Sequence, residues 1–504
     1  MILIWIILIP FIGGLLSWQG ERFSAELSRW IALASMALVF VLAMSLWFEG
    51  AYTLQTAAAQ QGQWQLEYNF PWISRLGVSF HLALDGLSLI MVILTGLIGV
   101  VAVACSWKEI KNHAGFFYLN LLWSMSGVLG VFLAIDLFLF FVFWEIMLVP
   151  TYFLIALWGH RSADGKRDRF YAANKFFIFT QIGGLILLIS ILALVFINYQ
   201  HTGQLSFAYD TLRATPLTFT TEYLLMLGFF IAFAIKLPVF PLHSWLPDAH
   251  AQAPTGGSVD LAGLLLKTAA YGLLRFSLPF FPHASAAFAP IAMSLGLVGI
   301  IYGAMMAFVQ TDIKRLVAYT SVSHMGFVLI GVFSFTTFAL QGVIVQMVAH
   351  GISAAALFII CGIVYERLHT RDLREMGGLW GRMAYLPSIS LFFAAASLGL
   401  PGLGNFVGEF LILLGAFSVA PWLTAFATGG LILASVYSLW MMQKTFYGPA
   451  KSEEGLTSLN PRELIILLSL MLILLVIGVY PQPLLNTSAS TVNLLQNFLL
   501  SVTQ

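Results

Sequence analysis

Residues 236–243 read Lys-Leu-Pro-Val-Phe-Pro-Leu-His, and this run lies inside an apolar stretch long enough to cross a membrane. Proline lacks a backbone donor and clashes with the preceding helical turn, so the run should break its helix. In lipid the freed carbonyl groups need other partners, which places such a break inside a helix bundle or beside water. Residues 399–409, Gly-Leu-Pro-Gly-Leu-Gly-Asn-Phe-Val-Gly-Glu, form a second poor helix. The sequence therefore predicts two broken membrane helices.

The composition around these runs is that of a membrane protein. Of the 504 residues, 60% are hydrophobic and 9% are charged, whereas soluble domains carry about 25% charged residues. We therefore expect an all-α polytopic membrane protein, with a single transmembrane domain over residues 1–504. Fourteen apolar runs of spanning length fit the chain: 2–18, 29–48, 84–106, 115–134, 136–158, 171–197, 223–245, 258–279, 287–309, 315–333, 338–365, 385–418, 423–446 and 463–480.

Basic residues divide unevenly among the loops between these spans. The even-numbered loops hold only Arg75 and Arg213. Cytoplasmic loops are enriched in Lys and Arg, so the odd-numbered loops should face the cytoplasm and both termini the other side. The odd-numbered loops hold Arg22, Arg29, Lys108, Lys111, Arg161, Lys166, Arg167, Arg169, Lys314, Arg315, Arg367, Arg371, Arg374, Arg382, Lys444, Lys451 and Arg462.

The second loop has a pattern of its own. Apolar and polar residues alternate over 64–70 and again over 78–84, with Pro71 between the two runs. A period of two is typical of strands. The pattern favours a short hairpin on the outer face, and a plain irregular loop is the alternative.

Counting the spans in fives gives two matching groups, residues 115–279 and 287–446, with the broken helix fourth in each. An odd number of helices per group makes the second group enter the membrane with the opposite orientation. Interrupted segments at corresponding places are typical of inverted-repeat transporters. We predict two inverted five-helix repeats, preceded by N-terminal helices and an outer loop (1–114) and followed by a C-terminal loop and last helix (447–504).

Four ionisable residues lie deep inside apolar spans: Glu145, Lys236, Lys267 and Glu409. A charge at the bilayer centre costs about 2.5–3.5 kcal/mol, so a chain that accepts this cost for both signs is expected to move ions. Lys236 is the best candidate partner of Glu145, and movement of the carboxylate would switch the lysine between holding and releasing a proton. The alternatives are an ion pair that only locks two helices, and a lysine that extends to the interface.

Further candidates surround these four. Asp260 precedes Lys267 by two helical turns, so both should share a face, with Asp260 nearer water; the pair either lines a channel or is a fixed ion pair. Glu409 is a candidate exit group. Among the weaker candidates, His324 and His350 are either relay or core residues, and His243 and His250 could link the first break to Lys267. Glu109 is an ordinary loop charge on sequence alone, and Asp136 is either a helix cap or a group that attracts cations. Lys175 and Arg275 are interpreted as span-end residues.

The chain lacks the usual sequence marks of a redox or nucleotide site. Its two cysteines, Cys105 and Cys361, are far apart and form no Cys-x-x-Cys pair. A glycine-rich nucleotide turn and a phosphate-binding loop are also missing from the sequence. We therefore predict no bound iron–sulfur cluster, zinc, NADH, flavin or ATP. Without a basic tract, we expect no nucleic-acid partner either.

Three motifs now point to a family. Residues 143–150, 236–250 and 253–267 together resemble the antiporter-like subunits of proton-pumping NADH–quinone oxidoreductase, respiratory complex I, and the resemblance covers essentially the whole chain. It implies a membrane-arm subunit of a translocating enzyme, without a redox cofactor, in a bacterial inner membrane. Its partners would be other membrane-arm subunits, including other antiporter-like ones, lipid and protons.

The resemblance also implies roles for individual residues. Glu145 and Lys236 would be the family's switch pair, Lys267 a central channel lysine, and His324 and His350 part of the connecting polar axis. Glu109 matches a carboxylate of the third helix. Glu409 stands where two of the three large members carry lysine, and about twenty residues follow the last span. Both points favour one particular member.

Two other classes remain open on sequence. Monovalent cation/proton antiporters and membrane-bound hydrogenases share the core motifs and are the alternative assignment. A non-transporting scaffold subunit is a third class, and it predicts that the buried charges are dispensable. Peripheral iron–sulfur and flavin subunits encoded nearby would favour complex I.

Overall fold

The computed structural model describes residues 1–50, 64–160, 168–449 and 456–503. Thirteen helices in these ranges are long and apolar enough to cross a membrane. They are α1 (Ile2–Gly20), α2 (Ala25–Phe48), α4 (Gly86–Cys105), α5 (Ala114–Leu133), α6–α7 (Leu137–Ile146 and Leu148–Trp158), α8 (Arg169–Thr202), α10 (Phe219–Lys236), α12–α14 (Thr255–Phe280), α15 (Pro282–Phe308), α16 (Ile313–Phe333), α17 (Thr337–Leu368), α20 (Pro421–Phe446) and α21 (Pro461–Val479).

Two shorter apolar helices supply the remaining span. α18 (Leu386–Ser397) and α19 (Gly404–Phe417) follow one another across a break. The all-α fold and the fourteen spans are thus confirmed. The orientation toward the cytoplasm stays a prediction, and four of the basic loop residues on which it rests lie outside the described residues: Arg161, Lys166, Arg167 and Lys451.

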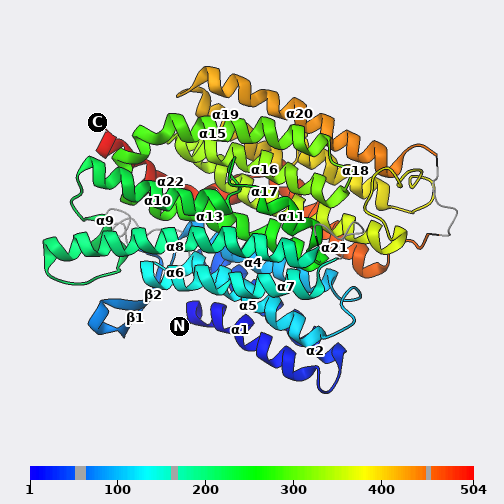
Figure 1. The fold of residues 1–504 in the computed structure, drawn as a ribbon, viewed down its shortest axis with the longest axis horizontal. Helices are drawn as coiled ribbons and strands as arrows, with labels where there is room; N and C mark the ends of the chain where they lie inside the picture. Colours follow the sequence, from blue (N-terminus) through cyan, green and yellow to red (C-terminus); the bar gives the residue numbers. More distant parts are fainter. Residues whose placement is uncertain (51–63, 161–167, 450–455, 504) are drawn as a thin grey trace.

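The spanning helices run roughly along the long axis of the molecule (Figure 1). α1 and α2 form one edge and α20 forms the opposite edge. Between them, α16 and the α12–α14 span are buried along the whole of their apolar windows. The core of the protein therefore consists of the helices that carry Lys267 and His324.

The predicted hairpin is present. β1 (Leu66–Ile73) pairs antiparallel with β2 (Val78–Leu84), with Phe70 opposite Phe80. It lies at the end of the molecule that also holds both termini (Figure 1). A helix that was not predicted, α22 (Gln482–Thr503), packs against α4 and α17. The indole of Trp47, in α2, also donates to the Thr487 hydroxyl of α22 at 2.8 Å.

Acidic caps fix where several spans begin, because a carboxylate accepts from the free amides of a first helical turn. Asp85 accepts from the Ser88 amide at the start of α4. Asp312 does the same for Lys314 and Arg315 at the start of α16. Asp136 accepts from two amides of α6 and from Ser79 of the hairpin. Of the two interpretations of Asp136, capping is therefore the one that its contacts support.

The first predicted break follows Lys236, where α10 ends. Pro238 has no amide to give to the Ala234 carbonyl four residues earlier, and the Val239 amide takes that place at 2.8 Å. The Ile235 carbonyl, which Val239 would otherwise satisfy, accepts instead from the indole of Trp245 at 2.8 Å. α11 (Trp245–Gln252) then completes the span. The freed carbonyls thus find protein partners, as a break in a membrane requires.

The second predicted break joins α18 to α19. Gly399 and Gly402 take φ values of +80° and +94°, which favour glycine because it has no β-carbon. Both broken spans are confirmed. The inverted-repeat relation between the two groups of five helices stays a prediction.

The α12–α14 span holds two π-helical segments, Leu261–Leu265 and Leu273–Ser277. Such widened turns are rare and are often found at functional sites. The first lies directly before Lys267 and the second contains Arg275. The first run contains Gly263 and the second contains neither glycine nor proline, so the two runs share no sequence signal for a widened turn.

Candidate functional site

Glu145 and Lys236 act on each other electrostatically without a direct bond. In the described chain, neither Lys236 Nζ nor Glu145 Oε1 has a hydrogen-bond partner. The Lys236 ammonium lies 3.9 Å from the centroid of the Trp144 ring, where the ring face attracts a cation. The two side chains still interact electrostatically, and Asp260 also acts on Lys236. The two residues predicted as partners therefore interact through their charges and not through a hydrogen bond.

α8 controls the space around the Glu145 carboxylate through Gly184. A β-carbon at Gly184 would lie 2.0 Å from Glu145 Oε1, whereas one at the adjacent Gly183 would lie 3.2 Å from the end of the Ile235 side chain. The first contact requires the carboxylate to move. The second is tight but leaves Glu145 untouched.

The resemblance to antiporter-like subunits implies proton translocation, and we expect Gly184→Ala to lower it several-fold, because the added methyl group displaces the carboxylate that acts electrostatically on Lys236. Gly183→Ala is the matched control on the same helix and should remain near wild type. Both are measured in vesicles with equal amounts of assembled complex. Equal activity of the two variants would mean that the position of Glu145 does not matter.

Lys267 lies at the centre of the core and is fully buried. Its ammonium donates to the Ala262 carbonyl, which belongs to the π segment. It also contacts His350 Nδ1 of α17 at 2.8 Å. The widened turn thus supplies one of the two acceptors that hold the lysine inside the bundle. The contact with His350 is short enough for a proton to pass between the lysine and the histidine.

Asp260 differs from the sequence expectation in two ways. It is fully buried, so the expectation that it lies near water is wrong. Lys267 hydrogen-bonds to His350 and to the Ala262 carbonyl, while Asp260 accepts from the Ser124 hydroxyl at 2.7 Å. The two-turn argument assumed regular α-helix, whereas a π segment separates the two residues. Asp260 acts electrostatically on Lys236 instead.

Glu409 is paired, although its own span offers no partner. Its Oε1 accepts from the Gln346 amide at 2.9 Å and lies 2.6 Å from His324 Nδ1. In the described chain its Oε2 has no hydrogen-bond partner. A β-carbon at Gly399 would lie 3.3 Å from that oxygen. One oxygen therefore faces the histidine and the other faces the second break.

The histidines connect these groups. The rings of His324 and His350 lie 5.5 Å apart between centroids. His324 Nε2 also lies 3.2 Å from the Ser397 hydroxyl and 3.3 Å from the Tyr437 hydroxyl. Lys267, His350, His324 and Glu409 thus form one buried row, which we call the central axis.

His243 and His250 occupy different surroundings. His243 packs among the rings of Phe240 and Tyr302. His250 is fully buried, stacks on Phe358, and has no partner for either ring nitrogen within the described ranges. The charges of both Lys314 and Lys267 act on it. Of the two, only His250 fits the expected link toward Lys267.

Glu109 lies in the loop before α5, and its surroundings are not those of an ordinary loop charge. Both of its carboxylate oxygens accept from the Thr255 amide at 3.1 Å. Burial raises the pKa of Glu109 above its usual range, while the charge of Lys314 opposes that rise. Burial also lowers the pKa of His160 to about 2. The contact between His160 Nε2 and Glu109 Oε1, at 3.8 Å, is therefore made by a neutral imidazole at pH 7.

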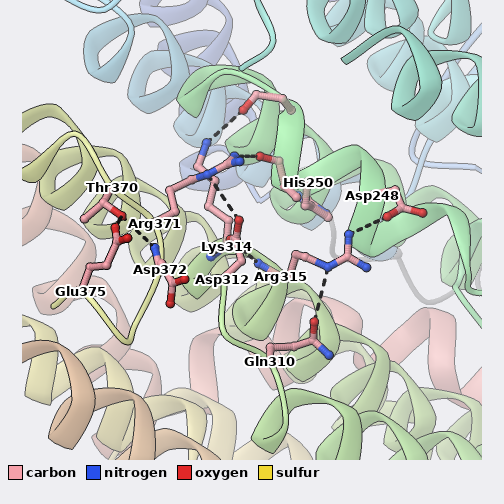
Figure 2. A network of polar contacts seen from close by, with 12 residues as sticks. Asp248, His250, Gln310, Asp312, Lys314, Arg315, Thr370, Arg371, Asp372 and Glu375 are labelled. Atoms are coloured by element: carbon pink, nitrogen blue, oxygen red, sulfur yellow. Dashed lines mark hydrogen bonds and ion pairs between the residues drawn. The ribbon is translucent and has the colours of Figure 1, made fainter. Parts of the chain in front are cut away.

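Cations from the first turn of α16 and from the loop after α17 hold the second half of the first broken span. Figure 2 shows Arg315 paired with Asp248 at 2.5 Å, and Arg371 beside Asp312 at 3.3 Å. Lys314 donates to the Ala253 carbonyl at 2.9 Å and Arg371 to the Ala251 carbonyl. Cations suit the carbonyl end of a helix. This cluster fixes the C-terminal end of α11.

Sequence reasoning placed several of these charges wrongly. The expectation that Lys314 is a loop charge is wrong, because Lys314 lies in the first turn of α16 and is fully buried. Arg275, which the sequence places at a span end, is buried and pairs with Asp85 at 2.5 Å. Lys175, read the same way, pairs with Asp248 at 2.7 Å. In each case the partner comes from a distant span, so no local sequence signal marks the pair.

The candidate site is a row of proton-exchanging groups without metal-ligand geometry. In the residues that the structure describes, no three His, Cys, Asp or Glu side chains are placed to hold a metal ion. Lys, Glu and His share the ability to gain and lose a proton in suitable surroundings. The arrangement is therefore suited to passing protons between neighbours.

Comparisons with known proteins agree on one family. The family described as NADH:quinone oxidoreductase/Mrp antiporter, TM, matches residues 134–434. NADH-quinone oxidoreductase subunit M of Pseudomonas aeruginosa is 64% identical over 499 residues, covering 99% of this chain and 98% of that protein. Subunit M of Escherichia coli strain K12 is 62% identical over 507 residues, covering 100% and 99%.

Solved structures show the same fold. A chain of respiratory complex I from Thermus thermophilus with bound NADH aligns with a TM-score of 0.87 and 31% identity, covering 99% of both chains. A chain of the Mrp complex from Dietzia sp. aligns with a TM-score of 0.81 and 20% identity, covering 98% of this chain and 97% of that one. The second likeness is one of fold alone.

The fold and the matched region define a membrane subunit of the kind that NADH:quinone oxidoreductases and Mrp antiporters share. Sequence identity over the full length is specific enough to separate members of that class. The chain belongs to the NADH-quinone oxidoreductase subunit M family. It is a multi-pass integral protein of a bacterial inner membrane and part of an enzyme complex.

Proposed function

We propose that the chain moves protons across the membrane as the subunit M of an NADH-quinone oxidoreductase, coupled to quinone reduction elsewhere in the complex. Glu145 and Lys236 act as the switch pair. Lys267, His350 and His324 pass the proton along, and Glu409 releases it. Other membrane-arm subunits, including antiporter-like ones, and lipid are the partners. The redox cofactors belong to other subunits.

The central axis is the observation that supports this function most strongly. Lys267 contacts His350 at 2.8 Å and His324 contacts Glu409 at 2.6 Å, with the two histidine rings 5.5 Å apart. Four buried groups that can exchange protons thus lie in one row, which starts at Lys267 in the first group of five helices and continues through the second group. Burying such groups is costly unless they are paired. A protein that needed only stability would fill these positions with apolar side chains.

The two broken spans lie at the ends of this arrangement. Lys236 is the last residue of α10, before the first break, and Glu409 lies in α19, just after the second. Non-helical backbone at membrane depth is tolerated where it lines a cavity or is covered by protein. This placement favours a division into two inverted repeats, 115–279 and 287–446, each with its own half of the path.

The monovalent cation/proton antiporter is the second candidate function, because the Mrp complex shares the fold. The full-length identity to subunit M favours the oxidoreductase. The two assignments differ in ion dependence. NADH-driven translocation that is unchanged when all sodium is replaced by choline supports the first.

Lys267→Ala tests the proposed function. We expect the assembled complex to lose more than about tenfold of its NADH-driven proton translocation, because proton-transfer groups contribute factors of about 10²–10⁴. The matched control is Lys444→Ala, which removes a lysine that lies over Trp440 at the exposed end of α20. Near-normal translocation by Lys267→Ala would refute the central axis.

A further inference from the structure

The two histidine rings of the central axis contact different partners. His350 Nδ1 lies 2.8 Å from the Lys267 ammonium, and in the described chain its Nε2 has no hydrogen-bond partner. His324 Nδ1 lies 2.6 Å from Glu409 Oε1, while its Nε2 contacts two hydroxyl groups. The two ring planes are inclined at 62° and their centroids lie 5.5 Å apart. His324 is thus held toward Glu409, and each of its nitrogens is bonded to a group other than His350.

Ser397 and Tyr437 supply the two hydroxyl groups on His324 Nε2. The Ser397 hydroxyl lies 3.2 Å from this nitrogen and the Tyr437 hydroxyl lies 3.3 Å from it. Ser397 is the last residue of α18, directly before the second break, and Tyr437 belongs to α20. Both side chains are buried in the bundle. The imidazole of α16 is therefore fixed between hydroxyl groups from two further helices and the carboxylate of α19.

The Ser397 hydroxyl is used differently from that of Ser390, a buried serine of the same helix. The Ser390 hydroxyl donates to the Leu386 carbonyl one turn earlier at 2.7 Å, which is a common arrangement for serine inside a helix. The Ser397 hydroxyl bonds instead to a side chain of another helix. The second break thus brings a hydroxyl group to one nitrogen of His324 and the Glu409 carboxylate to the other.

A hydroxyl group suits this position because it can both donate and accept a hydrogen bond. It donates to a bare ring nitrogen and accepts from a protonated one, so it stays bonded to His324 Nε2 in either state. A carboxylate could only accept and an ammonium could only donate. A ring released from both hydroxyls would have His350 Nε2 as a second possible partner. The two hydroxyls therefore keep His324 Nδ1 directed at Glu409 while the charge of the ring changes.

We propose that Ser397 and Tyr437 are positioning residues that hold the His324 ring in the orientation from which it gives its proton to Glu409. The proposal rests on the proposed function, because it adds two residues to the releasing end of the central axis. When both ring nitrogens carry a proton, the Nδ1 proton passes to Glu409 Oε1. The carboxylate becomes the neutral acid, and the ring becomes neutral with its remaining proton on Nε2. The hydroxyl groups accept from that Nε2–H and prevent the ring from turning away.

Removing the hydroxyl groups tests this role. Tyr437→Phe and Ser397→Ala should each slow the formation of the NADH-driven membrane potential about fivefold, the usual effect of one hydrogen bond, and the double variant should slow it more than about tenfold. Ser390→Ala is the matched control in α18. Tyr118→Phe, which removes a buried tyrosine hydroxyl from α5, is the control for the ring. Both controls should match wild type at equal amounts of assembled complex.

Measurements in D2O separate positioning from a structural role. If the ring is misdirected, proton transfer from His324 to Glu409 becomes slow, so the ratio of the rates in H2O and D2O should rise above that of wild type in Tyr437→Phe and in Ser397→Ala. If the hydroxyls only satisfy a buried nitrogen, their loss lowers the number of active complexes. The isotope ratio of the remaining complexes then stays that of wild type.

The outcomes separate this inference from the function on which it rests. A double variant with the wild-type rate, or slow variants with the wild-type isotope ratio, would overturn the positioning role. If Lys267→Ala and Glu409→Ala are inactive in the same experiment, the central axis still stands. If Lys267→Ala pumps normally, the proposed function itself fails. Should Tyr437→Phe not assemble, Ser397→Ala and its control Ser390→Ala decide.

Discussion

Replacing Glu145 or Lys236 by alanine is expected to abolish or severely reduce proton pumping while the complex still assembles. Each variant removes one of two charges that act on each other without a direct bond. In wild type, a proton arriving at Lys236 changes the field at Glu145, and the reverse holds as well. Without either partner this exchange stops. Coupled electron transfer should slow too, because it cannot proceed far against a blocked proton path.

The loss should come from proton transfer and not from unfolding. Lys236 has no hydrogen-bond acceptor to lose within the described chain, so Lys236→Ala removes a buried charge together with its contact to Trp144. Assembly is quantified from the subunit content of the purified complex. Glu26→Ala, at the exposed start of α2, is the matched control. A near-normal proton gradient in an assembled Glu145→Ala complex would remove the switch pair.

The second large effect is expected at Glu409, where the type of charge decides the outcome. Glu409→Ala and Glu409→Gln should lose most of the pumping, whereas Glu409→Lys should keep part of it. An acid and a lysine can both exchange a proton when their surroundings allow it, and glutamine cannot. One carboxylate oxygen already faces His324 at 2.6 Å, which is the contact such an exchange needs.

The alternative for Glu409 is a purely structural bond between α19 and its neighbours. On that account Glu409→Gln would be well tolerated, because its carbonyl oxygen still accepts from the Gln346 amide. Glu409→Lys would be the worst choice, because it places a cation beside that amide and His324. Proton translocation in vesicles at matched assembly separates the two accounts. Wild-type activity of Glu409→Gln together with an inactive Glu409→Lys would show that Glu409 is not the exit group.

Local sequence decided the fold because a membrane demands local features. Spanning runs must be apolar over their whole length, and Pro238 and Gly399 break helices wherever they stand. The hairpin followed from a period of two in 64–84. The sequence does not predict helix α22, because α22 lies beyond the last apolar run and its mixed composition resembles that of a polar tail.

The candidate site was predictable as a set of residues but not as a set of contacts. Glu145, Lys267 and Glu409 were conspicuous because a charge in an apolar run is costly. Their partners come from other spans, 83 residues away for Lys267 and His350, and 85 for His324 and Glu409. The π segment before Lys267 depends on how α12–α14 packs in the core. The sequence places Lys314 in a loop, because its burial in the first turn of α16 depends on how the whole fold packs.

The most direct test of the account is the proton yield of one set of variants measured side by side. NADH oxidation and proton uptake are recorded in vesicles that contain equal amounts of wild type, Glu145→Ala, Lys267→Ala, Glu409→Ala and the control Lys444→Ala. The account predicts that the first three variants lose most of their proton uptake and that Lys444→Ala matches wild type. Wild-type proton uptake by Glu145→Ala, Lys267→Ala and Glu409→Ala would contradict proton transfer through these residues. The chain would then be a scaffold subunit.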